Sequence, residues 1–313
     1  MTRTVSVFLL LIFSALHCQS ADQIIRGKDH FSFSVEIQLP EVISDGNLWV
    51  PLPKSDPFQE VIEVTHPADL PITRHSDPKH QNHYLHIPLT PSEAGEKLSF
   101  RYVIKRTEKS PYKVIDKSGI NKHLAPEKLV PASPVLKEIA NEVTGKIDGE
   151  KRKAQALYEH TLSRMRYDKS GKGWGRGDAL FACDSRTGNC TDFHSYFIGL
   201  ARSVGIPARF AIGFTIPADK DSGTIGGYHC WAEYFTEGRW IPVDISKADK
   251  HPELATYYAS HHPANRLQLT TGRDLQLKPA PKTGTLNYFV YPHLEIEGKS
   301  VLPNTKFTFK RIK

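Results

Sequence analysis

The sequence lacks the patterns that mark several common classes of protein. Its four cysteines form no pair at CxxC spacing, so we expect neither a bound metal nor another cofactor. Lysine and arginine are interleaved with aspartate and glutamate without a long basic run, which argues against binding to nucleic acid. No internal repeat or low-complexity segment is present. The 313 residues are instead enough for two modest folded domains.

The N-terminal hydrophobic run, Val5–Leu16, is too short to span a bilayer comfortably. Arg3 precedes it and small residues follow it, which predicts a secretory signal peptide over residues 1–20, cleaved after Ser20 or at the next bond. Lipid attachment at Cys18 is an alternative, but the bulky, polar His17 before it disfavours this. Cleavage leaves a net charge of about +6, and hence a mild attraction to acidic surfaces. We therefore expect an exported protein, periplasmic or secreted, without stable membrane insertion.

Cys190 lies where a turn passes into a helix. Apolar side chains recur after it at helical spacing and mark one buried stripe, formed by Phe193, Tyr196, Phe197, Leu200, Ala201 and Val204. Asn189 is a good N-cap, and Asp192 three residues later resembles a capping box with a shorter acid. Gly205, with a proline soon after, ends the helix. Cys190 is thus the first helical residue, and its sulfur should point inward.

The start of a helix also changes the chemistry of a thiol. Unpaired N–H groups of the first turn favour the thiolate and lower the thiol pKa, whereas the nearby Asp192 carboxylate raises it. On the helix alone, a cysteine that merely packs the helix end is an equally good interpretation of Cys190. Other residues must decide whether Cys190 is a reactive thiol or a packing residue.

Two strands further along the chain supply an imidazole and a carboxylate. Alternation places His229 and Trp231 on one face of the first strand, and the second strand ends at Asp244. A two-residue hairpin loop at Glu237-Gly238 sets Trp231 opposite Asp244, which makes Asp244 the diagonal neighbour of His229. An odd loop without a bulge would put Asp244 on the wrong face. A cysteine, a histidine and an aspartate placed in this way form the arrangement that activates a cysteine nucleophile.

The sequences GNCTDF around Cys190, YHCWAE around His229 and WIPVD ending at Asp244 resemble, in this order, the motifs of the transglutaminase-like superfamily. The resemblance covers roughly Leu157 to Ser246. It implies an exported bacterial cysteine enzyme with a papain-like α+β core. The resemblance also implies that Cys190 is the nucleophile, that His229 is the base, and that Asp244 orients the imidazole. Cross-linking activity is not implied.

We therefore expect thiol-dependent acyl transfer on amide bonds of peptides or of glutamine-type carboxamides, with water as the usual acceptor. The partner is then a peptide or protein substrate, and the substrate's identity and the oligomeric state stay open. The alternative is a non-catalytic transglutaminase-like module for binding or assembly, against which the intact set of three residues argues. Cys190→Ala and His229→Ala should abolish turnover. Asp244→Asn should be milder, because an asparagine can still orient the imidazole.

The predicted fold class is α+β, with a papain-like or transglutaminase-like core preceded by an all-β sandwich-like domain and followed by a C-terminal β extension. The segments are 1–20 (signal peptide), 21–108 (sandwich-like domain), 109–133 (polar connector), 134–265 (core) and 266–313 (extension). Strands are expected at Phe31–Ile37, Tyr84–Ile87, Leu98–Ile104, Asn287–Tyr291 and Phe307–Phe309. Core helices are expected from Pro134 and over Gly149–Arg166. The extension is too small to stand alone and should pack on another unit.

The glycine-rich segment 171–178 predicts a flexible loop and not a phosphate-binding loop. Within it, Trp174 could line the substrate cleft or donate its indole N–H to an oxyanion, although a tryptophan that pins the loop to the protein is at least as good an interpretation. The main-chain N–H of Cys190 is the safer oxyanion donor. The adjacent His261 and His262 lie in a polar segment and are expected to be solvated.

The other two cysteines of the mature chain, Cys183 and Cys230, could form a disulfide in an oxidising compartment. Cys183 lies in the segment before the nucleophile, and Cys230 is expected to face away from His229. Sequence does not show whether their Cα atoms come within bonding range. Two separate free thiols are therefore the default expectation.

Overall fold

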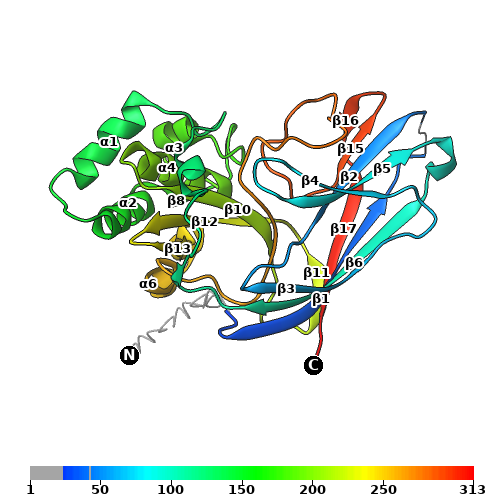
Figure 1. The fold of residues 1–313 in the computed structure, drawn as a ribbon, viewed down its shortest axis with the longest axis horizontal. Helices are drawn as coiled ribbons and strands as arrows, with labels where there is room; N and C mark the ends of the chain where they lie inside the picture. The colour runs from blue at the N-terminus through cyan, green and yellow to red at the C-terminus, as the bar shows by residue number, and fades with distance from the viewer. Residues whose placement is uncertain (1–23, 42–43) are drawn as a thin grey trace, which may run out of the picture.

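The structure is a computed structural model that describes residues 24–41 and 44–313, so the predicted signal peptide lies outside the described residues. Figure 1 shows a helical half, which contains α1–α4 and the sheet beneath them, beside a half built of two sheets. Within the described part of the chain, no helix combines the length and the hydrophobicity needed to cross a membrane. The predicted fold class is confirmed.

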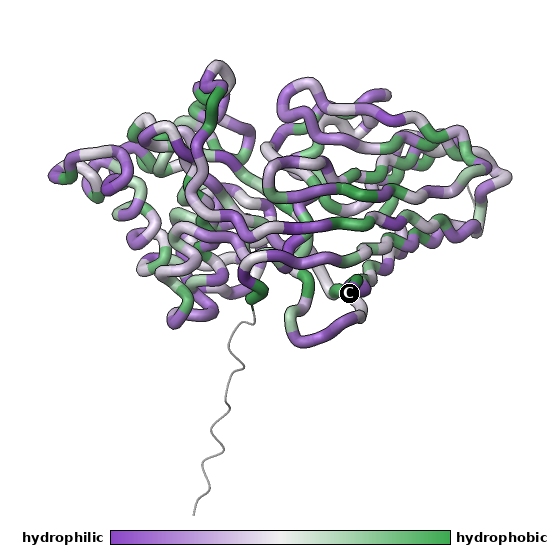
Figure 2. Tube along the Cα trace, turned by 60° about the horizontal axis from the view of Figure 1, so that its bottom comes forward, coloured by the Kyte–Doolittle hydropathy of each residue, from purple (hydrophilic) through white to green (hydrophobic). Residues whose placement is uncertain are grey.

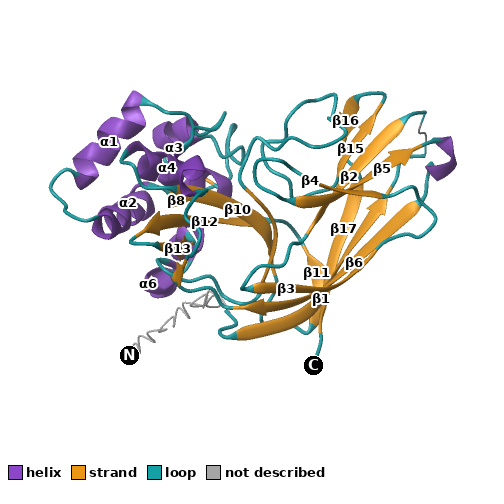
Figure 3. Ribbon diagram, in the orientation of Figure 1, coloured by secondary structure: helices purple, strands orange, loops and turns teal. Residues whose placement is uncertain are grey.

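In the described residues the chain forms helices, strands and three short 3-10 turns, and Figure 3 shows the helices α1–α4 gathered in one half. The helices are α1 Pro134–Thr144, α2 Glu150–Arg164, α3 Ala179–Ser185, α4 Cys190–Ser203, α5 Ile245–Lys250 and α6 Ala255–Tyr258. The 3-10 turns are η1 Pro91–Glu93, η2 Ile120–Leu124 and η3 Pro252–Leu254. The strands are β1 Lys28–Gln38, β2 Gly46–Leu52, β3 Gln59–Thr65, β4 Thr73–Ser76, β5 His83–Leu89, β6 Lys97–Thr107, β7 Tyr112–Lys113, β8 Arg166–Tyr167, β9 Thr187–Gly188, β10 Ala208–Thr215, β11 Ser222–Ile225, β12 His229–Thr236, β13 Arg239–Val243, β14 Arg266–Thr271, β15 His293–Ile296, β16 Lys299–Val301 and β17 Asn304–Arg311.

The sandwich is built from both ends of the chain. Its two sheets have the orders β11-β17-β1-β6-β3 and β16-β15-β2-β5-β4. The C-terminal β17 pairs antiparallel with β1 along its whole length, and β15 pairs with β2. In Figure 1 the red C-terminal strands accordingly lie among the blue and cyan N-terminal ones. The C-terminal segment therefore packs on the sandwich, as its small size predicted.

Alternation along β1 explains the sandwich core. Phe31, Phe33, Val35 and Ile37 recur every second residue and are all buried, which gives one apolar face. In Figure 2 green and purple segments are interleaved along the strands of the sandwich, as this alternation requires. The edge strand β3 is more exposed, with only its first residue buried. The burial pattern thus follows the order of strands within each sheet.

The helical half is organised around α4. A third sheet, β14-β10-β12-β13-β7, packs against α4 on one side, and α1, α2 and α3 pack against the same helix. Every residue of α4 from Cys190 to Ala201 is buried, not only the predicted apolar stripe. The reason is that α4 is enclosed by other elements rather than lying on the surface. Its polar residues are therefore buried too, and each needs a partner.

The two halves share one hydrophobic core. Phe214, near the end of β10, packs against Phe33 of β1 with 4.9 Å between ring centroids, and against Phe307 of β17 at 4.7 Å. The strand β11, which follows β10 in the chain, pairs with β17 in the sandwich. The core sheet and the sandwich are consequently joined through buried aromatic contacts and a shared chain segment. The predicted domain boundaries stay predictions.

One predicted strand is absent. Residues Asn287–Tyr291 form an irregular segment, and β15 begins only at His293, after Pro292. Side chains of the irregular segment are anchored elsewhere, because the Tyr288 hydroxyl donates to the Gly175 carbonyl at 3.1 Å. The segment is thus hydrogen-bonded to the glycine-rich loop of the helical half. Its aromatic residues pack without ladder pairing, with Phe289 buried and Tyr288 and Tyr291 half-buried.

Candidate active site

Cys190 is the first residue of α4, as predicted. Asn189 caps the helix, with its Oδ1 accepting from the Thr191 N–H at 2.9 Å. Asp192 completes the capping box, because its Oδ2 accepts from the Asn189 N–H, also at 2.9 Å. The Cys190 side chain is buried, with 2% of the residue exposed. The local sequence signals therefore fix the position of the thiol.

Asp192 has a second role that the sequence did not reveal. Its carboxylate also accepts from the N–H groups of Gly175, at 2.7 Å, and Gly177, at 2.9 Å, so it ties the glycine-rich loop to the start of α4. Burial raises the Asp192 pKa, although these N–H donors oppose the rise. A Cβ atom on Gly188 would lie 2.5 Å from the Asp192 carboxylate, so only glycine fits there. Asp192 thus organises the segment before the thiol.

The hairpin has the register that the sequence predicted. Thr236 pairs with Arg239 across a two-residue loop at Glu237-Gly238, and both loop residues have positive φ, 49° and 76°. This register brings the end of β13 beside the start of β12. The His229 Nε2 atom lies 2.7 Å from Asp244 Oδ2. The predicted contact between the imidazole and the carboxylate is therefore present.

Asp244 is fully buried and surrounded by donors. Its Oδ1 accepts from the Lys247 N–H at 3.1 Å, which makes Asp244 the N-cap of α5, and from the Ser246 hydroxyl at 3.2 Å. Its Oδ2 accepts from Arg266 Nη2 at 2.5 Å as well as from His229. Burial raises the Asp244 pKa, but the positive charges of His229 and Arg266 outweigh it and hold the pKa well below its usual range. Asp244 is an anion at neutral pH.

Arg266, on β14, is the functional neighbour that sequence reasoning missed. Its side chain is fully buried, and its guanidinium lies 4.8 Å from the centroid of the Trp231 ring. Trp231 is two residues after the imidazole on β12, so the guanidinium is packed against the same strand face. No local motif marks Arg266, because it reaches Asp244 from 22 positions further along the chain. It supplies the counter-charge that keeps Asp244 ionised.

The Cys190 thiol and the His229 imidazole shift each other's pKa. Burial raises the Cys190 pKa, but hydrogen bonds from Cys230 and His229, and the charge of His229, hold it well below its usual value. Burial lowers the His229 pKa, and the neighbouring Asp244 and Cys190 more than reverse this, so that it is raised. These opposite directions describe a thiolate and an imidazolium that stabilise one another. Because Nε2 faces Asp244, Nδ1 is the nitrogen left for the sulfur.

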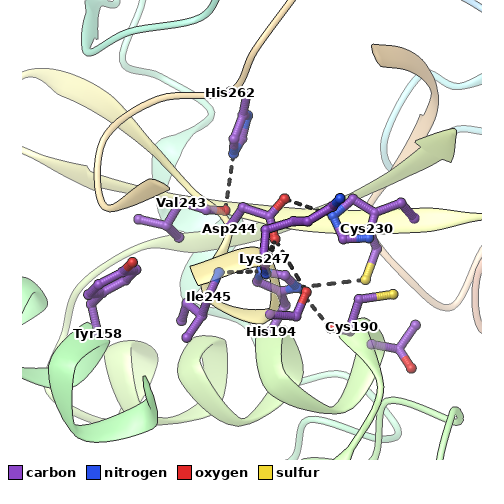
Figure 4. A network of polar contacts seen from close by, with 12 residues as sticks. Tyr158, Cys190, His194, Cys230, Val243, Asp244, Ile245, Lys247 and His262 are labelled. Atoms are coloured by element: carbon purple, nitrogen blue, oxygen red, sulfur yellow. Dashed lines mark hydrogen bonds and ion pairs between the residues drawn. The ribbon is translucent and has the colours of Figure 1, made fainter. Parts of the chain in front are cut away.

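His194 connects Cys190 to α5 (Figure 4). The Ile245 N–H donates to His194 Nε2 at 3.1 Å, so this nitrogen carries no proton. The proton is then on Nδ1, which donates to the Cys190 carbonyl at 2.7 Å. Burial lowers the His194 pKa, which is consistent with a neutral ring. His194 therefore fixes the first turn of α4 to the helix that follows Asp244.

Three tyrosines lie beside the thiol. The Tyr228 hydroxyl accepts from the Asn189 side-chain amide at 3.1 Å, and its main-chain N–H donates to the Tyr291 hydroxyl at 3.1 Å. Tyr288 packs on Tyr228, with 5.7 Å between the ring centroids. Burial raises the pKa of the Tyr228 hydroxyl, and a negative charge on Cys190 raises it further. Residues of the C-terminal segment therefore contribute to the surroundings of Cys190.

Trp174 is half-buried in the glycine-rich loop, and the Lys169 ammonium lies 5.6 Å from its ring centroid. Gly175, the next residue, is bound to Asp192, which places the loop beside the start of α4. None of the contacts described for the Cys190 thiol comes from Trp174. The cleft-lining and oxyanion roles of Trp174 stay predictions.

The expectation for His262 is wrong. This histidine is fully buried, its Nε2 lies 3.0 Å from the Val243 carbonyl oxygen, and its ring packs on Trp231 with 5.8 Å between centroids. Burial holds its pKa well below the usual range. The segment around it is polar in sequence, but it pairs with Lys109 through an isolated bridge that carries it into the core. His261 is half-buried and lies 2.9 Å from the Ser260 hydroxyl.

The three cysteines of the described residues are free thiols, so Cys183 and Cys230 form no disulfide. Cys230 instead faces α4, where its sulfur lies 3.7 Å from His194 Nδ1. Within residues 24–41 and 44–313, no group of three or more histidine, cysteine, aspartate or glutamate residues is placed to hold a metal ion.

Comparison with known proteins agrees with this geometry. Residues 137–245 match the transglutaminase-like superfamily. The chain carries a transglutaminase-like domain. Over 80% of its length it is 26% identical to an uncharacterized protein of Haemophilus influenzae, of which the match covers 81%. Over 24% of its length it is 33% identical to the uncharacterized protein YebA of Bacillus subtilis, of which only 12% is matched.

A solved structure resembles nearly the whole chain. It is a Cytophaga hutchinsonii protein named a "putative cysteine protease", and it superposes with a TM-score of 0.58 at 16% sequence identity. The superposition covers 91% of this chain and 98% of that one. At this identity the likeness shows the fold alone. The transglutaminase-like domain and its flanking sandwich are thus an arrangement that another protein shares.

Proposed function

We propose that the protein is a cysteine enzyme that transfers acyl groups from amide bonds of peptides or glutamine-type carboxamides, most often to water. The observation that carries this proposal is the His229 imidazole, whose Nε2 lies 2.7 Å from the Asp244 carboxylate and which lowers the pKa of the Cys190 thiol. A buried thiol that only packed a helix end would need neither an imidazole in contact nor a carboxylate behind it. The transglutaminase-like fold is consistent with this chemistry.

The reaction follows from the protonation states. The Cys190 thiolate attacks the carbonyl carbon, a C–S bond forms, and the carbonyl oxygen becomes an oxyanion. The Cys190 main-chain N–H is the first-turn donor best suited to that oxyanion, because Asn189 already takes the N–H groups of Thr191, Asp192 and Phe193. Collapse of the intermediate breaks the C–N bond, and His229 gives its proton to the departing amine.

Water then resolves the thioester. His229, now neutral, takes a proton from the attacking water while Asp244 keeps the imidazole oriented. Collapse of the second intermediate breaks the C–S bond and releases a carboxylic acid, and the thiolate is restored. An amine in place of water would give transfer instead of hydrolysis. We favour hydrolysis because water is abundant, and export to the periplasm or outside the cell is part of the same proposal.

The alternative is a domain that binds or assembles without catalysis. Alkylation with iodoacetamide near neutral pH separates the two, with mass spectrometry locating the modified residue. The enzyme predicts preferential modification of Cys190, and the non-catalytic module predicts none. Cys183 is the internal control, because it is also a buried free thiol, and burial raises its pKa. Equal modification of both thiols would refute an activated Cys190.

Activity itself requires a substrate search. Peptide and glutamine-amide libraries should be incubated with the wild-type protein and with Cys190→Ala, and free amine or ammonia should be measured. Release by the wild type alone supports the proposal. Equal release by both proteins on every substrate found would place the chemistry elsewhere.

A further inference from the structure

The segment 166–178 lies in the helical half and borders the start of α4 (Figure 1). It begins with β8, which pairs parallel with β9, so that Tyr167 lies beside Gly188, two residues before the proposed nucleophile. The Tyr167 ring packs on Phe193 of α4, with 6.3 Å between ring centroids. Further along, the Gly175 N–H donates to the capping carboxylate of α4 at 2.7 Å. The segment is therefore fixed at two places to the helical turn that carries the thiol.

Basic residues outnumber acidic ones in this segment. The basic residues are Arg166, Lys169, Lys172 and Arg176, and the acidic residues are Asp168 and Asp178. Both carboxylates already have partners. That of Asp168 accepts from the N–H and the hydroxyl of Ser170, each at 2.7 Å, and that of Asp178 caps α3. The local excess of positive charge is therefore not cancelled by the acids of the segment itself.

The arginines and the lysines of this region have different partners. Arg166 lies 4.0 Å from the Asp249 carboxylate, and Arg176 lies 3.7 Å from that of Asp178. In the part of the chain that the structure describes, by contrast, neither Lys169 nor the nearby Lys250 forms an ion pair with a carboxylate. These two lysines are the cations that a ligand could engage.

Aromatic rings position both lysines. The Lys250 ammonium, at the end of α5, lies 3.3 Å from the centroid of the Tyr167 ring, and the Lys169 ammonium lies 5.6 Å from that of Trp174. Both lysines are exposed. A cation that lies over an aromatic face is held in place while its N–H groups can still donate to another acceptor.

The helix that carries Lys250 is itself tied to the site. Asp244 is the N-cap of α5, and the Asp249 carboxylate of the same helix accepts from the Tyr167 N–H at 2.9 Å. Lys250 consequently reaches the ring that packs on α4 beside the thiol. The acyl-transfer steps give neither lysine a task, so their placement at the site needs an explanation of its own.

We infer that the enzyme acts on amide bonds of acidic peptides, and that Lys169 and Lys250 bind carboxylate groups that flank the cleaved bond. The inference rests on the proposed acyl transfer at Cys190, which requires an amide and so selects a peptide over other anions. Exposed cations beside a reacting atom raise the local concentration of anionic ligands and repel basic ones. The two lysines are thus specificity-determining residues and take no part in bond breaking.

The first test needs no substrate. Iodoacetate and iodoacetamide have the same leaving group, but only iodoacetate is an anion, so the ratio of their rates at Cys190 reports the charge around the thiol. The reduced full chain should be treated with each reagent near pH 7 at low salt, and mass spectrometry should quantify modification of Cys190. Because the His229 imidazolium also attracts iodoacetate, the ratio is compared between variants.

Lys169→Gln and Lys250→Gln should each lower the iodoacetate-to-iodoacetamide ratio about twofold, and the double variant about fourfold, since a unit charge at roughly 10 Å in water changes a rate by about that factor. NaCl at about 0.5 M should remove most of the difference, because it screens exposed charges. Lys105→Gln is the matched control, since Lys105 is an exposed lysine on β6 of the sandwich. It should leave the ratio unchanged, and circular dichroism should show all variants folded.

The second test uses matched peptides that carry either glutamate or glutamine beside the cleaved amide. Wild type should have the higher kcat/KM on the glutamate peptide, chiefly through a lower KM. The double variant should lose this preference, whereas Lys105→Gln should keep it.

An unchanged reagent ratio in the double variant overturns the inference, as does a wild-type preference for neutral or basic peptides. A ratio that falls without any preference among the peptides also overturns it, because the lysines would then face an anion other than the substrate. All of these results leave preferential modification of Cys190 by iodoacetamide intact, so they do not touch the proposed function. Absence of that preferential modification overturns both.

Discussion

Replacing Asp244 should lower the stability of the fold more than any other single change at the site. The Asp244 carboxylate accepts hydrogen bonds from four donors: His229 and Arg266 on Oδ2, and the Ser246 hydroxyl and Lys247 N–H on Oδ1. Asp244→Asn keeps the shape but replaces one oxygen by an NH2 group. Whichever way the amide is turned, its NH2 faces donors, and the buried Arg266 cation loses its counter-charge.

The magnitude follows from the burial of this pair. Asp244 and Arg266 both have fully buried side chains, and removing one partner of a buried ion pair costs about 3–5 kcal/mol. That is a large fraction of the roughly 5–15 kcal/mol that stabilises a folded domain. For a domain of this size, each kcal/mol corresponds to about 2–4 °C in Tm. We therefore expect Asp244→Asn to lower Tm by about 6–20 °C.

A double-mutant cycle checks the cause. Thermal unfolding by circular dichroism should be measured for wild type, Asp244→Asn, Arg266→Met and the double variant. The double variant should recover part of the loss, because it no longer buries an uncompensated cation. A Tm for Asp244→Asn within about 2 °C of the wild type, or strictly additive losses, would refute this reasoning. The activity of Asp244→Asn should be measured only at temperatures at which this variant is folded. Under those conditions the mild loss of turnover expected from the sequence can be tested.

Four further outcomes are expected. Cys190→Ala should lose all turnover while its Tm stays within a few degrees of wild type, whereas His229→Ala should keep the thiol but move its alkylation midpoint toward the ordinary value near 8.5, as iodoacetamide titration will show. The pH profile of kcat/KM should be bell-shaped, since the thiolate forms above the lowered Cys190 pKa and the imidazolium is lost above the raised His229 pKa; a single rising limb would contradict the ion pair. Asp192→Ala should release the glycine-rich loop, so that trypsin cleaves after Arg176 faster than in the wild type, and an unchanged cleavage rate would contradict the tethering role.

Local signals made half of the site predictable. The helix beginning at Cys190 follows from a cap, an acid three residues later and an apolar repeat, and all of these lie within one short segment. The register that joins His229 to Asp244 follows from the length of one hairpin loop. Both are short-range features, in which sequence spacing translates directly into geometry.

The remaining half depends on contacts between distant segments. Arg266 reaches Asp244 from another strand, and nothing in its own neighbourhood indicates this partner. His262 looked solvated because its neighbours are polar, yet its bridge to Lys109 carries it into the core. Cys230 faces α4, and only the packing of that helix on the strand brings its sulfur within 3.7 Å of His194 Nδ1. Such pairings need tertiary structure, since spacing along the chain does not constrain them.

The sandwich is part of the architecture of the site, because C-terminal residues bind the segment that leads into His229 at two places. The strand β11, which ends four residues before His229, pairs with the C-terminal β17, with Ile225 opposite Phe307. Tyr291, from the segment just before β15, accepts a hydrogen bond from the main chain of Tyr228. Both contacts come from the end of the chain, which also completes the sandwich around β1. Loss of that pairing would therefore loosen the imidazole relative to the thiol.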